Sequence, residues 1–244
     1  MHLTLAQSVE LARAVKDGAK DAKCEVSVCV PFTAISVVAE TLRGSNVRLG
    51  AQDCYWEAQG AFTGEVSAPQ LADAGCQLVI IGHSERRRLF GDTDENINKK
   101  LKAALAAKLT PIVCVGETLE EREAQRTFKV LQTQLEGGLK GFAPADISSV
   151  VIAYEPVWAI GTGKTATPDQ AQEAHLFIRK QCAKLYGDGF AAGVRILYGG
   201  SVKADNVDNL MAQPDLDGAL VGGDSLKAQN FLRIIHFQTV GAAR

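Results

Sequence analysis

The sequence has 244 residues, of which 46% are hydrophobic and 22% are charged, and its formal net charge is −2 at pH 7. These values are typical of soluble globular proteins, and without a basic excess we expect no nucleic-acid partner. No run of about 18 apolar residues and no signal peptide are evident, so we expect a cytoplasmic protein with no membrane partner.

The six cysteines are scattered along the chain, and none of them forms a Cys-x-x-Cys pair. Several fall in strand or helix patterns, where a small buried thiol is the ordinary interpretation. We therefore expect free thiols in a reducing compartment and no metal site.

Short apolar segments alternate with amphipathic segments along the chain. The expected helices span Leu3–Val15, Thr33–Leu42, Pro69–Ala74, Glu95–Ala107, Leu119–Leu135, Pro168–Leu185, Ala204–Met211 and Ser225–Val240. The expected strands span Glu25–Val30, Val47–Leu49, Leu78–Ile81, Pro111–Val115, Val150–Tyr154, Val194–Leu197 and Ala219–Val221. This alternation predicts an α/β fold built from βαβ units around a parallel sheet.

Two architectures fit the pattern, an open doubly wound sheet and a closed (β/α)8 barrel. Roughly seven strands and eight helices, without a linker between them, favour a single barrel domain over residues 1–244. Because a barrel begins with a strand and this chain begins with a helix, we expect the first strand to lie upstream of Met1. The chain would then be N-terminally truncated relative to a complete barrel.

Glu155 stands at the end of an apolar, β-branched strand, and Pro156 prevents the strand's ladder of hydrogen bonds from continuing. A carboxylate at the carboxyl end of a barrel strand lies where such barrels build their active sites. The alternative is a structural ion pair, for which Arg86, Arg122 and Lys164 are candidate partners.

His83 also follows a strand directly, and it precedes a charged stretch. A closed barrel would bring His83 and Glu155 to the same face, and a carboxylate beside a neutral imidazole suits proton transfer next to a carbonyl group. If the amino end of a helix points at the ring, its pKa falls and the neutral form is favoured. A purely structural histidine is the alternative.

Two late segments repeat one pattern, a strand followed by Gly-Gly, a capping residue and a helix. They span Leu197–Asn206 and Leu220–Asn230. Paired glycines allow backbone N–H groups to approach an anion, so the repeat predicts a phosphate site, although two tight turns would need glycine as well.

The segment Gly161–Thr165 superficially matches nucleotide-binding motifs. A P-loop would require glycine where Trp158 stands and a helix directly after Lys164, so we discount that interpretation. The long loop Gln52–Ser67 carries Tyr55, Trp56 and Phe62, which suggests docking into a partner subunit or packing on its own domain.

Four segments together resemble the triosephosphate isomerase family, and the resemblance covers nearly the whole chain. They are Ala153–Gly163, Ile81–Arg86, Tyr198–Ser201 and Leu220–Gly223. The resemblance implies a homodimer that interconverts dihydroxyacetone phosphate and glyceraldehyde 3-phosphate in glycolysis and gluconeogenesis, without a cofactor.

The resemblance also implies roles for individual residues. Glu155 would shuttle the proton, His83 would polarise the carbonyl group, and Glu85 would be a carboxylate beneath the site. Substrate or phosphate contacts are implied for Gly161, Ser201, Leu220, Gly222 and Gly223. Support of the base and of a closing lid is implied for Ser84, Glu117, Tyr154, Trp158, Ile160 and Tyr198, and a dimer loop for Phe62 and Thr63.

The sequence departs from the family at its start. The family opens with a strand that runs into Asn-x-Lys, and Met1-His2 aligns just after that lysine. Without this cation we expect the chain alone to be nearly inactive, and without the first strand we expect it to be poorly soluble. The alternative function is therefore a catalytically impaired or non-catalytic barrel that binds a phosphorylated ligand.

Overall fold

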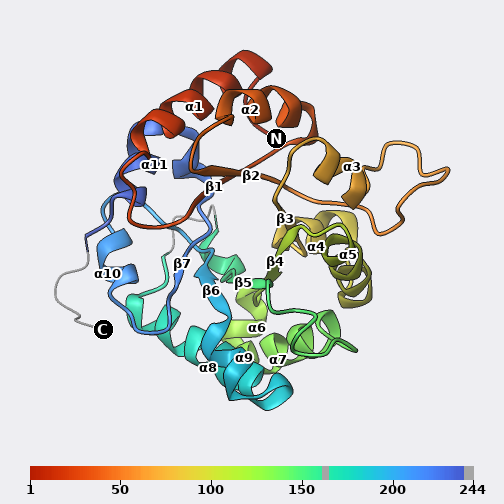
Figure 1. Cartoon of the computed structure of the whole chain (residues 1–244). Helices are drawn as coiled ribbons and strands as arrows, with labels where there is room; N and C mark the ends of the chain where they lie inside the picture. Colours follow the sequence, from red (N-terminus) through yellow and green to blue (C-terminus); the bar gives the residue numbers. More distant parts are fainter. Residues whose placement is uncertain (161–164, 239–244) are drawn as a thin grey trace.

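The structure is a computed structural model, and it describes residues 1–160 and 165–238. Within these residues, seven parallel strands pair in chain order: β1 (Val26–Val30), β2 (Val47–Ala51), β3 (Leu78–Ile81), β4 (Thr110–Val115), β5 (Val151–Tyr154), β6 (Arg195–Tyr198) and β7 (Gly218–Ala219). Figure 1 shows the strands curling around the centre of the molecule with the helices outside. The expected barrel architecture is confirmed.

The helices alternate with the strands, as the sequence pattern predicts. They are α1 (Leu5–Gly18), α2 (Ile35–Leu42), α3 (Ala68–Asp73), α4 (Ser84–Phe90), α5 (Asp94–Ala106), α6 (Leu119–Glu123), α7 (Thr127–Gly138), α8 (Pro168–Tyr186), α9 (Asp188–Gly193), α10 (Val207–Met211) and α11 (Ala228–Ile235). Three short 3₁₀ turns, η1 (Phe32–Ala34), η2 (Val157–Ala159) and η3 (Gly223–Leu226), follow strands. No helix in the described part of the chain is long and apolar enough to cross a membrane.

The central strands are buried on both faces. In β3, Leu78 and Ile80 belong to the inner cluster of the barrel, whereas Val79 and Ile81 belong to the layer that packs under the helices. The same alternation in β4 and β5 completes the inner cluster, which also contains Ile112, Cys114, Val151 and Ala153. Side chains that alternate between two buried faces explain why these strands are continuously apolar.

The two end strands are covered less well. In the described residues, β1 pairs with β2 alone and β7 with β6 alone. Four of the five residues of β1 are only partly buried, while all four residues of β3 are buried. Strands β3 and β5, all of whose residues are buried, lead to His83 and Glu155, respectively.

One expected helix, Leu119–Leu135, was wrong as a continuous element. It is divided into α6 and α7, because Gln125 adopts φ 56 and Ala124 closes the last turn of α6. A left-handed residue interrupts the helical hydrogen bonds, and glutamine gives no sign of that conformation in a sequence.

Four further elements differ from expectation. The charged stretch after His83 forms helix α4, and α9 was not expected. The last helix begins at Ala228, because Ser225 belongs to η3, and the final strand is Gly218–Ala219. Short elements bounded by glycine carry little periodicity, which explains these errors.

A buried ion cluster fixes α4 and α5 to the loop after β2. Lys100 is 2% exposed, and its Nζ lies 2.8 Å from both Asp53 Oδ1 and Asp92 Oδ2. Arg86 Nε lies 2.8 Å from Asp53 and 3.0 Å from Asp92. Burial raises the pKa of Asp53, and Lys100 opposes that rise. The cluster therefore supports the helix that follows His83.

The substitution Lys100→Met should destabilise the fold by about 3 kcal/mol, because it leaves two buried carboxylates with Arg86 alone. The measurement is urea denaturation at neutral pH. Lys102→Met on the exposed side of α5 is the matched control and should change the free energy of unfolding by less than about 0.5 kcal/mol. Equal effects of the two substitutions would contradict the role of the cluster.

Candidate active site

Strands β3 and β5 place His83 and Glu155 next to each other. His83 Nε2 lies 2.9 Å from Glu155 Oε1, although the two residues are distant in the chain. Both strands run parallel to β4 and pair with it, so their carboxyl ends lie at the same end of the barrel. Gly82 adopts φ +71 and turns the chain from β3 into α4, and His83 is the residue that caps α4.

The backbone fixes the tautomer of His83. The N–H of Glu85 donates to His83 Nδ1 at 3.2 Å, so Nδ1 accepts and Nε2 carries the proton. The Nε2–H group then donates to Glu155. The ring thus presents a neutral N–H donor toward the centre of the site.

The expected fall in the pKa of His83 is not found in the free site. Burial lowers the pKa, but the hydrogen bond and the charge of Glu155 outweigh burial, so that the pKa is raised. A molecule that separates the two side chains would remove both of these causes. Burial and the Glu85 N–H group, which remain, favour the neutral ring.

Glu155 is a buried carboxylate held by two donors. It is 2% exposed, and its Oε2 accepts a hydrogen bond of 2.9 Å from the N–H of Ser84. Its other oxygen accepts from His83. Burial raises the pKa of Cys114 beneath it, and the Glu155 charge raises it further.

The two arginines considered as ion-pair partners of Glu155 bind other carboxylates. Arg86 pairs with Asp53 and Asp92, and Arg122 pairs with Glu117. Lys164 lies outside the described residues. The structural ion pair considered as an alternative for Glu155 is therefore not formed with either arginine.

Gly116 makes the close packing of Glu155 possible. A Cβ atom on Gly116 would lie 1.7 Å from the carbonyl oxygen of Glu155. Both the N–H and the C=O of Gly116 are bonded to the side-chain amide of Gln134, at 2.8 and 3.1 Å. The backbone at the end of β4 is thus fixed against the residue that carries the carboxylate.

Glu117 accepts hydrogen bonds from three side chains next to the segment that follows Glu155. It is fully buried and accepts from Tyr154 at 3.1 Å, from Trp158 Nε1 at 2.9 Å and from Arg122 at 3.1 Å. Burial and the neighbouring Glu117 charge raise the pKa of Tyr154 well above its ordinary value. The Arg122 guanidinium also lies over the Trp158 ring, 4.6 Å from its centroid. The cluster ties η2 to β4 and β5.

Ile160, Tyr198 and Leu220 stand at the ends of η2, β6 and β7, respectively. Ile160 closes η2, and the N–H of Leu220 donates to the carbonyl oxygen of Tyr198 at 2.9 Å. Burial raises the pKa of Tyr198 to about 12, and the backbone of Ala166 opposes that rise. The Ala166 backbone lies near the Tyr198 hydroxyl, but no group in the described chain is hydrogen-bonded to that hydroxyl.

The two Gly-Gly segments follow β6 and β7. Ser201 accepts at its backbone oxygen from Asn206, and Gly223 begins η3. The space above Gly222 and Gly223 is open, because an added Cβ on either glycine would meet no atom within 4 Å. Gly161, the other expected phosphate contact, lies outside the described residues.

Glu85 lies beside the site with an exposed carboxylate. Its side chain is 63% exposed, and Oε2 lies 3.9 Å from His83 Nδ1. Its contact with His83 in this structure is made mainly by its backbone N–H.

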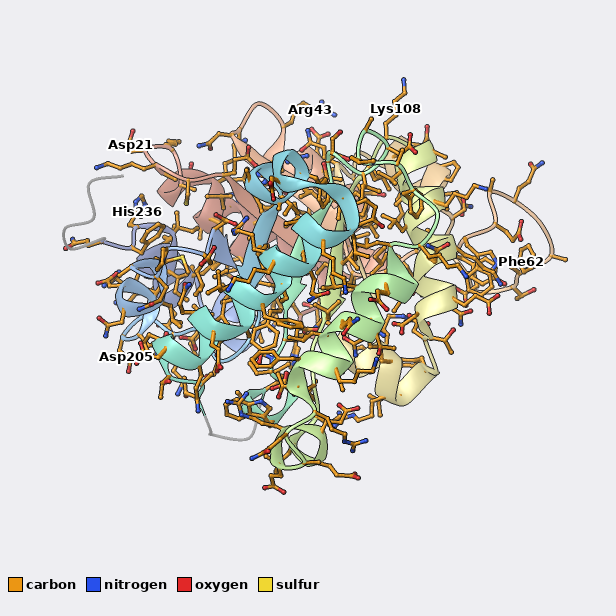
Figure 2. The ribbon with its side chains drawn as sticks, turned by 90° about the horizontal axis from the view of Figure 1, so that it is seen from below. Asp21, Arg43, Phe62, Lys108, Asp205 and His236 are labelled. Carbon is orange, nitrogen blue, oxygen red and sulfur yellow. The ribbon has the colours of Figure 1, made fainter. Side chains whose placement is uncertain are left out.

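The loop between β2 and α3 projects away from the barrel. Figure 2 shows Phe62 at its tip, and Phe62 is 40% exposed, with Thr63 exposed beside it. Tyr55 stacks on Trp56 with the ring centroids 4.1 Å apart, and the Phe62 ring lies 4.8 Å from that of Tyr55. The loop is stiffened by its own aromatic cluster.

Sequence reasoning did not identify Gly116, Gln134 or Cys114 as parts of the site. Gly116 follows a strand as Gly82 does, and that position was the available signal. No local pattern marks Gln134, because it lies on α7 and its side chain reaches Gly116 only in the folded structure.

Comparison with known proteins agrees with this geometry. The family model described as triosephosphate isomerase matches residues 1–238. The triosephosphate isomerase of Geotalea uraniireducens is 56% identical over 238 residues, which cover 97% of this chain and 95% of that protein. That of Citrifermentans bemidjiense is 59% identical over 213 residues, or 87% and 85% of the two chains.

A solved structure gives the same result in three dimensions. The crystal structure of triosephosphate isomerase from Bartonella henselae is 41% identical and covers 96% of this chain and 93% of its own, with a TM-score of 0.87. Sequence, fold and the paired Glu155 and His83 therefore agree that the chain belongs to the triosephosphate isomerase family.

Proposed function

We propose that Glu155 and His83 carry out the isomerisation for which the family is named, the interconversion of dihydroxyacetone phosphate and glyceraldehyde 3-phosphate. The observation that carries the proposal is the buried Glu155 carboxylate, 2.9 Å from an imidazole whose Nε2 bears the proton. A base beside a neutral N–H donor suits proton removal next to a carbonyl group. The substrate would enter between the two side chains.

The chemistry needs only groups of the chain. Glu155 takes a proton from the carbon next to the carbonyl, and the electron pair moves to the carbonyl oxygen to form an enediolate. The Nε2–H of His83 stabilises the charge that develops on this oxygen. The hydroxyl proton on the first carbon passes to the former carbonyl oxygen, with His83 Nε2 between the two oxygens as the relay, and Glu155 returns its proton to the neighbouring carbon, so that the ketose becomes an aldose.

The phosphate group would bind at the loops after β6 and β7. The support is the open space above Gly222 and Gly223, where backbone N–H groups can approach an anion. Ser201 at the end of the other Gly-Gly segment would add a second contact, and Leu220 would pack beside Glu155. The same role is proposed for Gly161 on sequence grounds alone.

The segment after Glu155 would act as a lid hinge. Glu117 holds Tyr154 and Trp158, so η2 is a fixed base for the closing lid that the family resemblance implies. Ile160 and Leu220 would exclude water from Glu155 and so strengthen the electrostatic interactions within the site. Tyr198 would receive the far end of the segment.

We further propose that residues 1–244 form one domain, that the protein acts in the cytoplasm in glycolysis and gluconeogenesis, and that it is a homodimer. The exposed aromatic loop around Phe62 and Thr63 supports the dimer, because such a loop suits docking on a second copy. The alternative of an impaired, ligand-binding barrel gains no support from the comparisons, since relatives of nearly equal length bear the isomerase name.

The substitution Glu155→Gln should lower kcat/KM by about 100- to 10,000-fold, because an amide cannot accept the substrate proton. A coupled isomerase assay measures this effect. Glu10→Gln on the exposed face of α1 is the control and should stay within about twofold of the parent chain. Turnover by Glu155→Gln at the rate of the parent would refute the role of Glu155 as the base.

The substitution Gly116→Ala should lower kcat/KM by about 100-fold, because the new Cβ displaces the backbone of Glu155 and a shift of about 1 Å misplaces the carboxylate. Gly189→Ala is the control, since a Cβ there meets no atom within 4 Å. Activity of Gly116→Ala equal to that of the control would show that the packing at Glu155 tolerates the shift.

A further inference from the structure

His175 is a fully buried histidine on α8 that the proposed mechanism does not use. Its Nδ1 lies 3.2 Å from the carbonyl oxygen of Asp215. A carbonyl oxygen can only accept, so Nδ1 carries the proton and Nε2 presents a lone pair. Burial lowers the pKa of His175 to about 4, against the Asp215 hydrogen bond, and the ring is neutral at pH 7.

The Nδ1 side of the ring is held in place by a polar cluster. Arg179 Nε donates to Asp215 Oδ1 at 2.8 Å, and the N–H of Asp215 donates to Gln172 at 3.1 Å. Arg179 also donates to Asp217 at 2.7 Å. Because Asp215 is fixed in this way, the His175 ring cannot rotate without breaking its bond to the backbone.

The other ring nitrogen of His175, Nε2, is one of two buried polar atoms in this region that lack a hydrogen-bond partner in the described chain. Within the described chain, neither His175 Nε2 nor the hydroxyl of Tyr198 has a hydrogen-bond partner, although both atoms are buried. The ring centroids of His175 and Tyr198 are 6.2 Å apart. The centroid of the Tyr154 ring lies 5.8 Å from that of His175 and 6.4 Å from that of Tyr198. Nε2 is an acceptor, and the Tyr198 hydroxyl, whose oxygen lies near the Ala166 backbone, can donate its proton to such an acceptor. Each of the two atoms would cost about 1–3 kcal/mol if left unpaired.

The Tyr198 hydroxyl lies against the segment that carries the base. A Cβ on Gly200 would be 2.2 Å from this oxygen and 3.0 Å from Pro156 Cγ, so the three groups are packed together. Pro156 directly follows Glu155. The position of Tyr198 therefore affects the first residue of the lid segment.

We propose that His175 is a positioning residue for the isomerase, whose Nε2 accepts the phenolic proton of Tyr198 through one internal water molecule and so holds Tyr198 against Pro156. Two polar partners are the minimum that a buried water needs. The inference rests on the proposed role of Glu155, because His175 acts on the reaction only through the segment that carries this base.

Two substitutions distinguish the roles of the two ring nitrogens of His175. His175→Asn can keep the donor to Asp215 but removes the acceptor at Nε2, whereas His175→Gln places an acceptor near the Nε2 position. His175→Asn should lower kcat/KM by about 10-fold, the loss expected for one buried hydrogen bond, and His175→Gln should restore it to within about threefold of the parent. Thermal unfolding of each variant checks that the fold is intact.

A double-mutant cycle with Tyr198→Phe tests the coupling. His175→Asn should have no further effect on kcat/KM once the Tyr198 hydroxyl is absent. The same cycle is also measured as the affinity for 2-phosphoglycolate, a phosphorylated mimic of the enediolate, by calorimetry. The binding data test the coupling between His175 and Tyr198 even if the assay shows no isomerase activity.

Two results would overturn the proposal. One is an additive cycle in both kcat/KM and affinity for 2-phosphoglycolate. The other is a pair of variants, His175→Asn and His175→Gln, that lose thermal stability equally while kcat/KM stays at the parent value, which would leave His175 a structural residue only.

Discussion

The hydrogen bond between the neutral imidazole of His83 and the buried carboxylate of Glu155 is the interaction on which the site depends. It exists because β3 and β5 are both neighbours of β4 and end on the same face of the barrel. Backbone hydrogen bonds fix the orientation of both side chains. The backbone of α4 supplies a donor to His83 Nδ1 and another to Glu155 Oε2, so one helix start fixes both partners.

The surrounding structure keeps this pair at a short distance. Gly116 lets the β4 backbone reach the Glu155 carbonyl, and Gln134 holds Gly116 from α7. Glu117, the next residue, uses its buried charge to gather Tyr154, Trp158 and Arg122. A buried carboxylate is tolerated only when it is well paired, so this cluster constrains the segment after Glu155 strongly. This rigidity supports the proposed role of the segment as a lid.

Some features of the fold and the site could be predicted from local patterns. The apolar strands and the strand-end positions of His83 and Glu155 have local signals, and the structure contains them. The division of the Leu119–Leu135 helix at Gln125 and the 3₁₀ turn at Ser225 have none. The partners of Arg86 and Arg122 were equally open, because a long side chain has several carboxylates within reach until the helices are packed.

By itself, the sequence determined the barrel architecture, the residues at its strand ends and the resemblance to an isomerase family, because periodicity, proline, glycine and short motifs are local properties of the chain. Only the tertiary structure decided the tautomer of His83, the raised pKa that Glu155 imposes on it, and the burial of His175 and Tyr198 with two unsatisfied polar atoms. These features arise between segments that are distant in the chain. Their physical origin is the low-polarity interior, where hydrogen bonds and charges act over a few ångströms between groups that only the folded barrel brings together.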